Sequence, residues 1–294
     1  MGAVALLGAG GVVAEGWTRA GSFGYTGFSA VTWEGKAYLF GGVGADYVLS
    51  ARLFVFDVQT AAFSELKTTG ESPLPRRGHA AALFGHLMLV HGGTGDTALF
   101  NDLYALDLRV ARWRRLFAEG PRLLLRTNHC AAVDFRSRLV LWGGAAPNGP
   151  ALRLELVDLI QLHTARPQLR GSVPIATEFA ACAVLGGILA VFGGAKGPQL
   201  HDSLALLDLE SLRWSAVAAR GPSPRQQSTA LRVGEDLLVL GGTDPIRGLC
   251  FSEVWLYSPR VAEWSLLADL RGREGPATLV GTSLVLFGSS CPGQ

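Results

Sequence analysis

Short runs of apolar residues that end in two glycines recur along the chain. The first run reads Lys-Ala-Tyr-Leu-Phe-Gly-Gly and spans residues 36–42. An uninterrupted apolar run of this length, closed by turn residues, predicts a strand that is buried on both faces. Glycine suits the end of such a strand because it adopts positive φ without a steric penalty. The repeated glycines are Gly41, Gly42, Gly92, Gly93, Gly143, Gly144, Gly193, Gly194, Gly241, Gly242 and Gly288, the last followed by Ser289.

The spacing of these runs predicts the architecture. Successive leading glycines lie about 47 to 51 residues apart, which is the range of propeller blades of about 50 residues. The six copies predict an all-β, six-bladed propeller with four-stranded antiparallel blades. Because one period covers the whole chain, we expect a single domain over residues 1–294. The expected blades span about 21–66, 75–116, 125–169, 175–217, 225–267 and, for the sixth, 273–294 plus 1–20.

The last repeat stops after two predicted strands, at Gly288. Residues 4–7 resemble a third strand, and residues 15–19 resemble the start of a fourth. We therefore expect N-terminal strands to complete the last blade, because such pairing covers strand edges that would otherwise be exposed. The alternative for residues 2–11 is the apolar part of a signal peptide, but the positively charged start of such peptides is missing.

Each repeat also carries an acidic and an aromatic residue at fixed places. The third strand ends in Asp, whose carboxylate can accept hydrogen bonds from the turn that follows. About six residues later, a large ring opens the fourth strand and is expected to fill the space between blades. These structural positions are Trp17, Trp113, Trp214, Trp264, Asp57, Asp107, Asp158 and Asp208, whereas Phe63, Thr164 and Ser258 depart from the pattern.

Together, the glycine pair, the Asp-terminated third strand and the Trp resemble kelch repeats. The segment from Gly70 to His79, with Gly-x-x-Pro-x-Pro-Arg before Gly-His, is similar to the repeats of cytosolic kelch adaptors and effectors. The resemblance covers essentially the whole chain. It implies a kelch-type propeller in which the first strand of each blade is innermost. It implies the fold more strongly than the function, because one fold hosts unrelated activities.

Composition narrows the class of partner. The 26 Lys and Arg residues against 24 Asp and Glu residues give a formal net charge of +2, without a basic block, so we expect no nucleic acid partner. No apolar run approaches the ~20 residues of a membrane-spanning helix, so we expect no membrane partner. The four cysteines lie in different repeats and predict free thiols, a cytoplasmic or nuclear location and no secretion, with one distant disulfide as the alternative.

Arginines open the first strand of four repeats. They are Arg76, Arg126, Arg225 and Arg273, with Arg77, Gln226 and Gln227 beside them. If this strand is innermost, as the kelch resemblance implies, their guanidinium groups surround one mouth of the channel and could bind peptide carboxylates. Alternatively, each arginine holds a neighbouring blade through backbone carbonyls or an acid. Tyr25 in blade one and Ala176 in blade four interrupt the series, and Tyr25, Phe28, Glu178 and Phe179 would form a more apolar sector.

The loops after the glycine pairs differ between repeats while the strands stay similar, which is where a scaffold carries specificity. These loops are residues 43–50, 94–101, 145–153, 195–203 and 243–252. We hypothesise a monomeric scaffold or adaptor that binds a protein or peptide, acidic or carboxylate-bearing, on the loop-bearing face. The alternatives are a substrate receptor of a ubiquitin ligase and a kelch-like enzyme acting on a sugar or small metabolite.

Residues that would favour catalysis are not grouped convincingly along the sequence. Glu155, Asp158 and His163 are close in sequence, but they lie on a strand and the turn beyond it, so their side chains need not converge. Neither a nucleophile elbow nor a phosphate loop occurs. We therefore expect no enzyme activity, no catalytic or metal-binding residue and no cofactor.

Overall fold

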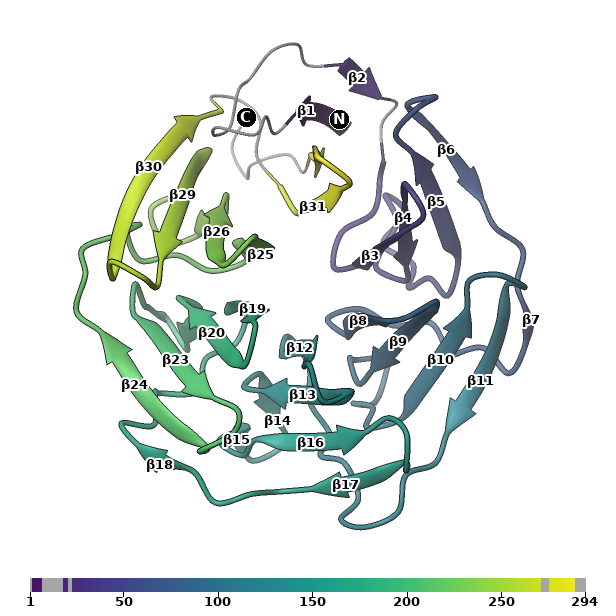
Figure 1. Ribbon diagram of the computed structural model, residues 1–294. Coiled ribbons are helices and arrows are strands. Elements are labelled where there is room, and N and C mark those ends of the chain that lie inside the picture. Colours follow the sequence, from purple (N-terminus) through teal and green to yellow (C-terminus); the bar gives the residue numbers. More distant parts are fainter. Residues whose placement is uncertain (1, 7–17, 21–22, 271–274, 289–294) are drawn as a thin grey trace. The chain divides into compact units, whose positions relative to one another are not determined.

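The structure is a computed structural model that describes residues 2–6, 18–20, 23–270 and 275–288. All regular elements in these ranges are β-strands. They form the repeated four-stranded antiparallel sheets of an all-β propeller, as predicted (Figure 1). The chain forms two compact units, one of residues 23–167 and the other of residues 1–22 with 168–294.

The unit of residues 23–167 contains three blades. Blade one consists of β3 (Ser29–Trp33), β4 (Lys36–Phe40), β5 (Leu53–Asp57) and β6 (Ala62–Glu65). Blade two consists of β8 (Ala80–Phe84), β9 (Leu87–His91), β10 (Leu103–Asp107) and β11 (Arg112–Leu116), with β7 (Thr69–Gly70) parallel to β11. Blade three consists of β12 (Cys130–Val133), β13 (Arg138–Trp142), β16 (Glu155–Asp158) and β17 (His163–Ala165), with a small hairpin of β14 (Ala145–Ala146) and β15 (Gly149–Pro150).

The other unit contains two blades built in the same way. Blade four consists of β19 (Ala181–Leu185), β20 (Ile188–Phe192), β23 (Leu204–Asp208) and β24 (Arg213–Val217), with β18 (Arg170–Gly171) parallel to β24 and a hairpin of β21 (Ala195–Lys196) and β22 (Gln199–Leu200). Blade five consists of β25 (Thr229–Val233), β26 (Asp236–Leu240), β29 (Glu253–Ser258) and β30 (Glu263–Asp269), with a hairpin of β27 (Thr243–Asp244) and β28 (Leu249–Cys250).

The two ends of the chain share a further sheet in this unit. Its strand order is β2-β1-β32-β31, from β31 (Ala277–Val280), β32 (Ser283–Phe287), β1 (Gly2–Leu6) and β2 (Thr18–Ala20). β1 pairs antiparallel with β32, so N-terminal residues do pair with the last repeat. The prediction of six blades is corrected to five: among the described residues, five blades are each built from one contiguous repeat, whereas the final repeat supplies just two strands. Trp17 and Arg273 lie outside the described residues.

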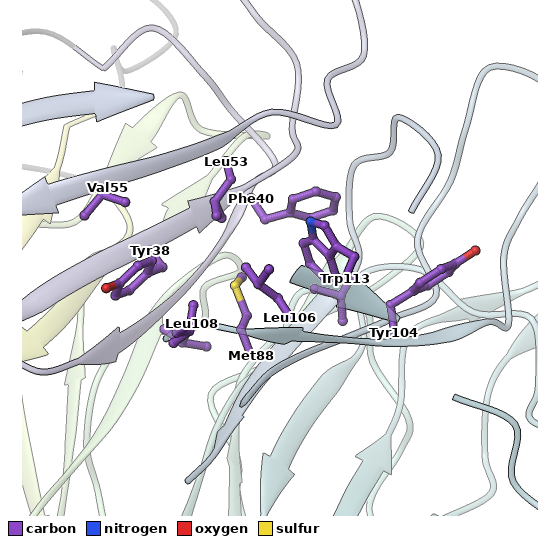
Figure 2. Packing of buried hydrophobic residues seen from close by; sticks show 11 residues of the cluster. Tyr38, Phe40, Leu53, Val55, Met88, Tyr104, Leu106, Leu108 and Trp113 are labelled. Carbon is purple, nitrogen blue, oxygen red and sulfur yellow. The ribbon is translucent and has the colours of Figure 1, made fainter. Parts of the chain in front are cut away.

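The apolar second strands form the cores between blades. In β4 and β9 the last four residues are all buried, which agrees with strands covered on both faces. Between blades one and two, the ring of Trp113 lies 5.0 Å from the ring of Phe40, and Met88 packs in the same cluster (Figure 2). The fourth-strand Trp therefore fills the space between two sheets, the role that the repeat pattern predicts for it.

The aspartates at the ends of the third strands shape the turns that follow. In Asp57, Asp107, Asp158 and Asp208, Oδ1 accepts a hydrogen bond of 2.9 to 3.0 Å from the backbone N–H two residues further on. These backbone donors stabilise the carboxylate and hold the pKa of Asp158 and Asp208 below the ordinary value. The four acids therefore act locally, within the turn of each blade.

The cysteines differ from the sequence-based expectation. Cys130, Cys182 and Cys250 are each disulfide-bonded, and none of the described cysteines is free. The prediction of free thiols is therefore wrong, and cysteine usage no longer supports a reducing compartment. Spacing could not reveal this, because the cysteines are far apart in the sequence and form no close motif.

Glycine pairs form the contact from one blade to the next. In blade two, Gly92 and Gly93 have φ of +66° and +93°. The N–H of Gly93 donates a 2.9 Å hydrogen bond to the carbonyl of Arg126, which opens blade three. A Cβ on Gly92 would lie 2.6 Å from that same carbonyl oxygen. Glycine is thus required twice, for its left-handed backbone and for the space that the next blade occupies.

The same contact recurs in both units. The N–H of Gly42 donates to the carbonyl of Arg76, and that of Gly194 donates to the carbonyl of Arg225, each over 2.9 Å. We call this hydrogen bond, from the second glycine of one blade to the carbonyl of the residue that opens the next, the inter-blade link. It joins neighbouring blades through backbone atoms alone.

A second row of backbone hydrogen bonds runs parallel to these links. The residue two positions after each blade-opening arginine has positive φ, and its N–H donates to the equivalent carbonyl of the preceding blade. Gly78 donates to Gly27 over 3.1 Å and Asn128 donates to Gly78 over 2.7 Å. In the other unit, Gln227 donates to Phe179 over 3.0 Å. Very different side chains therefore share one backbone role.

The inter-blade link can be tested with two alanine substitutions. Gly92→Ala forces a Cβ against the Arg126 carbonyl and is expected to lower the free energy of unfolding by about 3 kcal/mol or more. Gly85→Ala is the control, because Gly85 has φ of +59° and open space around its Cβ position; it should cost only about 1 kcal/mol. Urea unfolding of both variants measures the difference, and equal losses would contradict a steric role for the link.

Candidate functional site

Each blade carries its variable loop and its incoming chain at the same edge. In blade one, Ser29 at the start of the first strand opposes Phe40 at the end of the second, and Phe54 opposes Glu65 at the end of the fourth. We call this side of each blade the loop edge. It comprises the segments that enter the first strands and the loops of residues 43–50, 94–101, 145–153, 195–203 and 243–252.

Backbone bridges hold the loop edge in place. The incoming segment of every described blade forms an antiparallel bridge with the loop after the glycine pair: Thr26 with Val43, Arg77 with Thr94, Thr127 with Ala145, Glu178 with Ala195 and Gln226 with Thr243. These bridges fix the base of each loop and leave its tip to vary. A rigid base under a variable tip is the usual arrangement of a binding surface.

The blade-opening arginines do not face this surface. Arg76, Arg126 and Arg225 are each 0% exposed. The guanidinium of Arg76 donates to the carbonyls of Leu74 and Gly92 and pairs with Asp102 at 2.6 Å. Its donors are consequently used within the fold. The prediction that these three arginines line a channel mouth and bind peptide carboxylates is wrong. As in the alternative, their side chains bind backbone carbonyls and an acid, but these belong to the arginine's own blade and not to a neighbouring one.

Each of these arginines holds the glycine pair of its own blade. Arg126 donates to the carbonyl of Gly143 over 3.2 Å, and Arg225 donates to that of Gly241 over the same distance. The guanidinium of Arg225 also stacks 3.8 Å from the centre of the Phe251 ring. Because the backbone carbonyl of the same arginine accepts the inter-blade link, one residue fixes two successive glycine pairs.

An acid of the same blade pairs with each arginine. Asp102 and Glu253 lie directly before or at the start of the third strand, and Glu253 pairs with Arg225 at 2.5 Å. In blade three the acid is Glu155, which is 1% exposed and 2.7 Å from Arg126. Burial lowers the pKa of Arg126, although the carboxylate opposes that shift. Pairing with Glu155 therefore keeps Arg126 charged although it is buried.

Comparison between repeats could have revealed this pairing from sequence. In blade one, Tyr25 holds the arginine position and Arg52 holds the acid position, and Arg52 Nη1 donates to the Tyr25 hydroxyl over 3.2 Å. In blade four, the structure places Thr177 at the arginine position, one residue beyond the predicted Ala176. Its hydroxyl donates to the Gly193 carbonyl over 3.0 Å. The two positions change together from blade to blade.

The other predicted binding residues have separate surroundings. Tyr25 and Phe28 are half-buried in an aromatic cluster around Phe23, with ring centres 5.3 and 5.1 Å from that ring. Arg77 is exposed and Gln226 is half-buried, and both take part in the bridges of the loop edge. The structure therefore places Arg77 and Gln226 on the candidate surface but does not gather the predicted set into one site.

The buried ion pair of blade three predicts a large effect of substitution. Arg126→Met leaves the Glu155 carboxylate buried beside fewer donors and is expected to lower the free energy of unfolding by about 3 kcal/mol or more. The double variant Arg126→Met/Glu155→Met should recover part of this loss, and Arg77→Met, at an exposed position, should be nearly neutral. Urea unfolding measures all three. A stable Arg126→Met protein would contradict the structural role.

Buried histidines pack against the glycine pairs in the unit of residues 23–167. His91 Nδ1 lies 3.0 Å from His129 Nε2, and both side chains are buried. His79 lies 2.7 Å from the hydroxyl of Ser29. Burial, aided by the charges of Arg126 and Arg76, lowers the pKa of His91 to about 3, and burial lowers that of His129 well below 6.5. The imidazoles are therefore neutral in the folded protein at physiological pH.

The buried pair of His91 and His129 predicts that the folded protein loses stability in acid. In the unfolded chain the same histidines titrate near 6.5, so below that pH the unfolded state binds more protons than the folded state. The free energy of unfolding should fall as the pH drops from about 6.5 towards about 3. His129→Gln should flatten this dependence, whereas His86→Gln, in a partly exposed turn, should not. Urea midpoints across this pH range test it, and identical slopes for all three proteins would refute it.

Sequence analysis did not single out an aromatic turn on the loop edge of blade one. Tyr47 is 90% exposed and has φ of +62°. Its N–H donates to the Gly44 carbonyl over 3.0 Å, and the N–H of Gly44 donates to the Val48 carbonyl over 3.1 Å. Asp46 Oδ1 accepts a further bond from the Val48 N–H. The turn is thus closed by its own backbone and presents a large ring to solvent.

Further exposed apolar residues lie on the loop edge of this unit. Val48 is 60% exposed and Leu74 is 62% exposed. The loops that carry them are joined, because the N–H of Arg76 donates to the Ser50 carbonyl over 3.2 Å. Tyrosine is one of the residue types enriched among the central contacts of protein interfaces. The arrangement suits binding of an apolar side chain of a partner.

The described residues give no sign of a metal centre or a membrane-spanning helix. Within them, no group of three or more His, Cys, Asp or Glu side chains is placed to hold a metal ion. Nor do the described ranges contain a helix of the length and hydropathy needed to cross a membrane.

Comparison with known proteins identifies the family. The KLHDC2/KLHL20/DRC7 Kelch-repeats domain matches residues 24–133 and 94–291. The chain therefore belongs to the kelch-repeat family. It is 28% identical over 263 residues to Acyl-CoA-binding domain-containing protein 4 of Arabidopsis thaliana, covering 88% of this chain and 31% of that protein.

Two rodent relatives are also similar over most of the chain. Rab9 effector protein with kelch motifs is 29% identical in Rattus norvegicus and 30% identical in Mus musculus, over 198 residues in each case. These matches cover 62% of this chain and 52% and 51% of the two proteins. The chain thus spans about a third to a half of the length of these curated relatives, so the shared part is the kelch-repeat region.

Proposed function

We propose that the chain is a protein-interaction module that binds a segment of a partner protein at the loop edge of residues 23–167. The observation that carries this proposal is the closed turn that presents Tyr47 90% exposed, with Val48 next to it in sequence and the exposed Leu74 on the adjoining segment of the loop edge. Because the backbone of the turn is already ordered, a partner that binds the ring orders little additional chain. The kelch-repeat relatives named as Rab9 effectors support an adaptor role of this kind.

The chemistry of this surface indicates the kind of segment it takes. Tyr47, Val48 and Leu74 offer apolar contact, while Arg52, with a side chain 53% exposed, adds a positive group beside the half-buried Tyr25. Arg52 is already paired with Glu65, so its charge is partly neutralised. We infer that the partner contributes an apolar side chain as its main contact, with polar groups at the rim.

Affinity purification with quantitative mass spectrometry tests the proposal. The full chain carrying Tyr47→Ser and Leu74→Ser should capture its specific partners about tenfold less than the wild type, because both apolar contacts are lost. The matched control is Val110→Ser and Ile160→Ser, which also removes two exposed apolar side chains but from turns at the opposite ends of the strands. Circular dichroism should show unchanged melting for both. Equal capture by both variants would overturn the proposal.

A further inference from the structure

The outer strand of blade two is unusually basic. β11 reads Arg-Trp-Arg-Arg-Leu, and Arg109 precedes it in the turn. Arg112, Arg114 and Arg115 are all exposed, and the side chain of Arg109 is 57% exposed. Four arginines thus fall within seven residues of a chain whose formal net charge is only +2. We call this set the arginine stripe.

Most of this charge is uncompensated. Arg109 is paired with Asp107 at 2.9 Å. Within the described ranges, Arg112, Arg114 and Arg115 form no ion pair. The blade-opening arginines Arg76, Arg126 and Arg225, by contrast, are each paired with an acid. Charge without an internal partner at a solvent-exposed strand serves no purpose in folding, so it is available to an external group.

The corresponding strand of blade four provides an internal reference. β24 reads Arg-Trp-Ser-Ala-Val and has the same order of exposed and buried residues as β11. Arg112 opposes Asp107 in blade two as Arg213 opposes Asp208 in blade four. Arg114 and Arg115 therefore correspond to Ser215 and Ala216. The fold accepts small neutral residues at these positions, so it does not require the two arginines.

An exposed aromatic residue lies at the end of the stripe. Phe117 is 72% exposed, and the guanidinium of Arg115 lies 5.1 Å from the centre of its ring. Arginine and aromatic side chains together are enriched at the central contacts of protein interfaces. Arg115 also lies 5.9 Å from the Tyr104 ring, which orders its guanidinium. The stripe is therefore a charged surface with one apolar contact.

We propose that the arginine stripe binds an extended acidic segment of a partner protein that carries an apolar side chain next to its carboxylates. Guanidinium groups bind carboxylates through paired hydrogen bonds. Because alternate residues of β11 point to opposite sides of the strand, its arginines can bind acidic residues on either side of the partner segment. Glu71, which follows the residue paired with Trp113, and Glu119, which bridges to His163 of blade three, are exposed, so the positively charged surface is short. A short acidic peptide fits better than nucleic acid or a lipid surface. This site is separate from the loop edge of blade one.

Fluorescence anisotropy with a labelled peptide of Glu-Glu-Phe repeats tests the proposal on the full chain. The wild type should bind this peptide, and binding should weaken as salt is raised to about 0.3 M because exposed ion pairs are screened. R114S/R115A, which copies the β24 sequence, should bind about tenfold more weakly, since two ion pairs are lost. F117S should also weaken binding.

The matched control is R213S/R220A, which removes two exposed arginines from blade four and changes the net charge equally. It should change the affinity less than about twofold. Melting of every variant is followed by circular dichroism. Equal losses in R114S/R115A and R213S/R220A, or no peptide binding by the wild type, would overturn the proposal. Tighter binding of an oligothymidine or of phosphatidylserine vesicles than of the peptide would also overturn it, in favour of nucleic acid or membrane.

Discussion

The inter-blade link is the interaction on which the rest of the structure depends. The carbonyl of Arg126 enters the space beside Gly92 and accepts a hydrogen bond from Gly93, while the side chain of the same arginine binds the carbonyl of Gly143 in its own blade. Blades two, three and five are thereby each fixed to the preceding blade by a backbone carbonyl and to their own glycine pair by a buried cation. A propeller needs such directional contacts because apolar packing between sheets does not by itself set their register.

This arrangement separates two kinds of arginine. Arginines that open a blade are fully buried, paired with an acid and part of the fold. Arginines of β11 are exposed and unpaired among the described residues, and the equivalent strand of blade four replaces two of them. Residue type alone cannot distinguish the arginines that precede a first strand from those within a fourth strand. Burial and a fixed counter-charge make the difference.

The repeat pattern was enough to predict the all-β propeller class, the order of strands within a blade and the pairing of N-terminal residues with the last repeat. It failed where the outcome depends on contacts between side chains that are far apart in the sequence. The arginine position was assigned to a channel mouth because sequence does not show whether Asp102 or Glu253 is within reach. The cysteines were assigned as free for the same reason. Tyr47 was missed because a left-handed Tyr has no pattern that distinguishes it from other loop residues.

The row of positive-φ residues that joins neighbouring blades has a consequence for how this module can diversify. Gly78, Asn128 and Gln227 make the same contact with entirely different side chains, because only their peptide groups take part. Mutations near these positions can therefore alter the chemistry of the adjacent surface while the attachment between sheets persists. Selection can explore new partners at little cost in stability, which suits a scaffold that is reused in otherwise unrelated proteins.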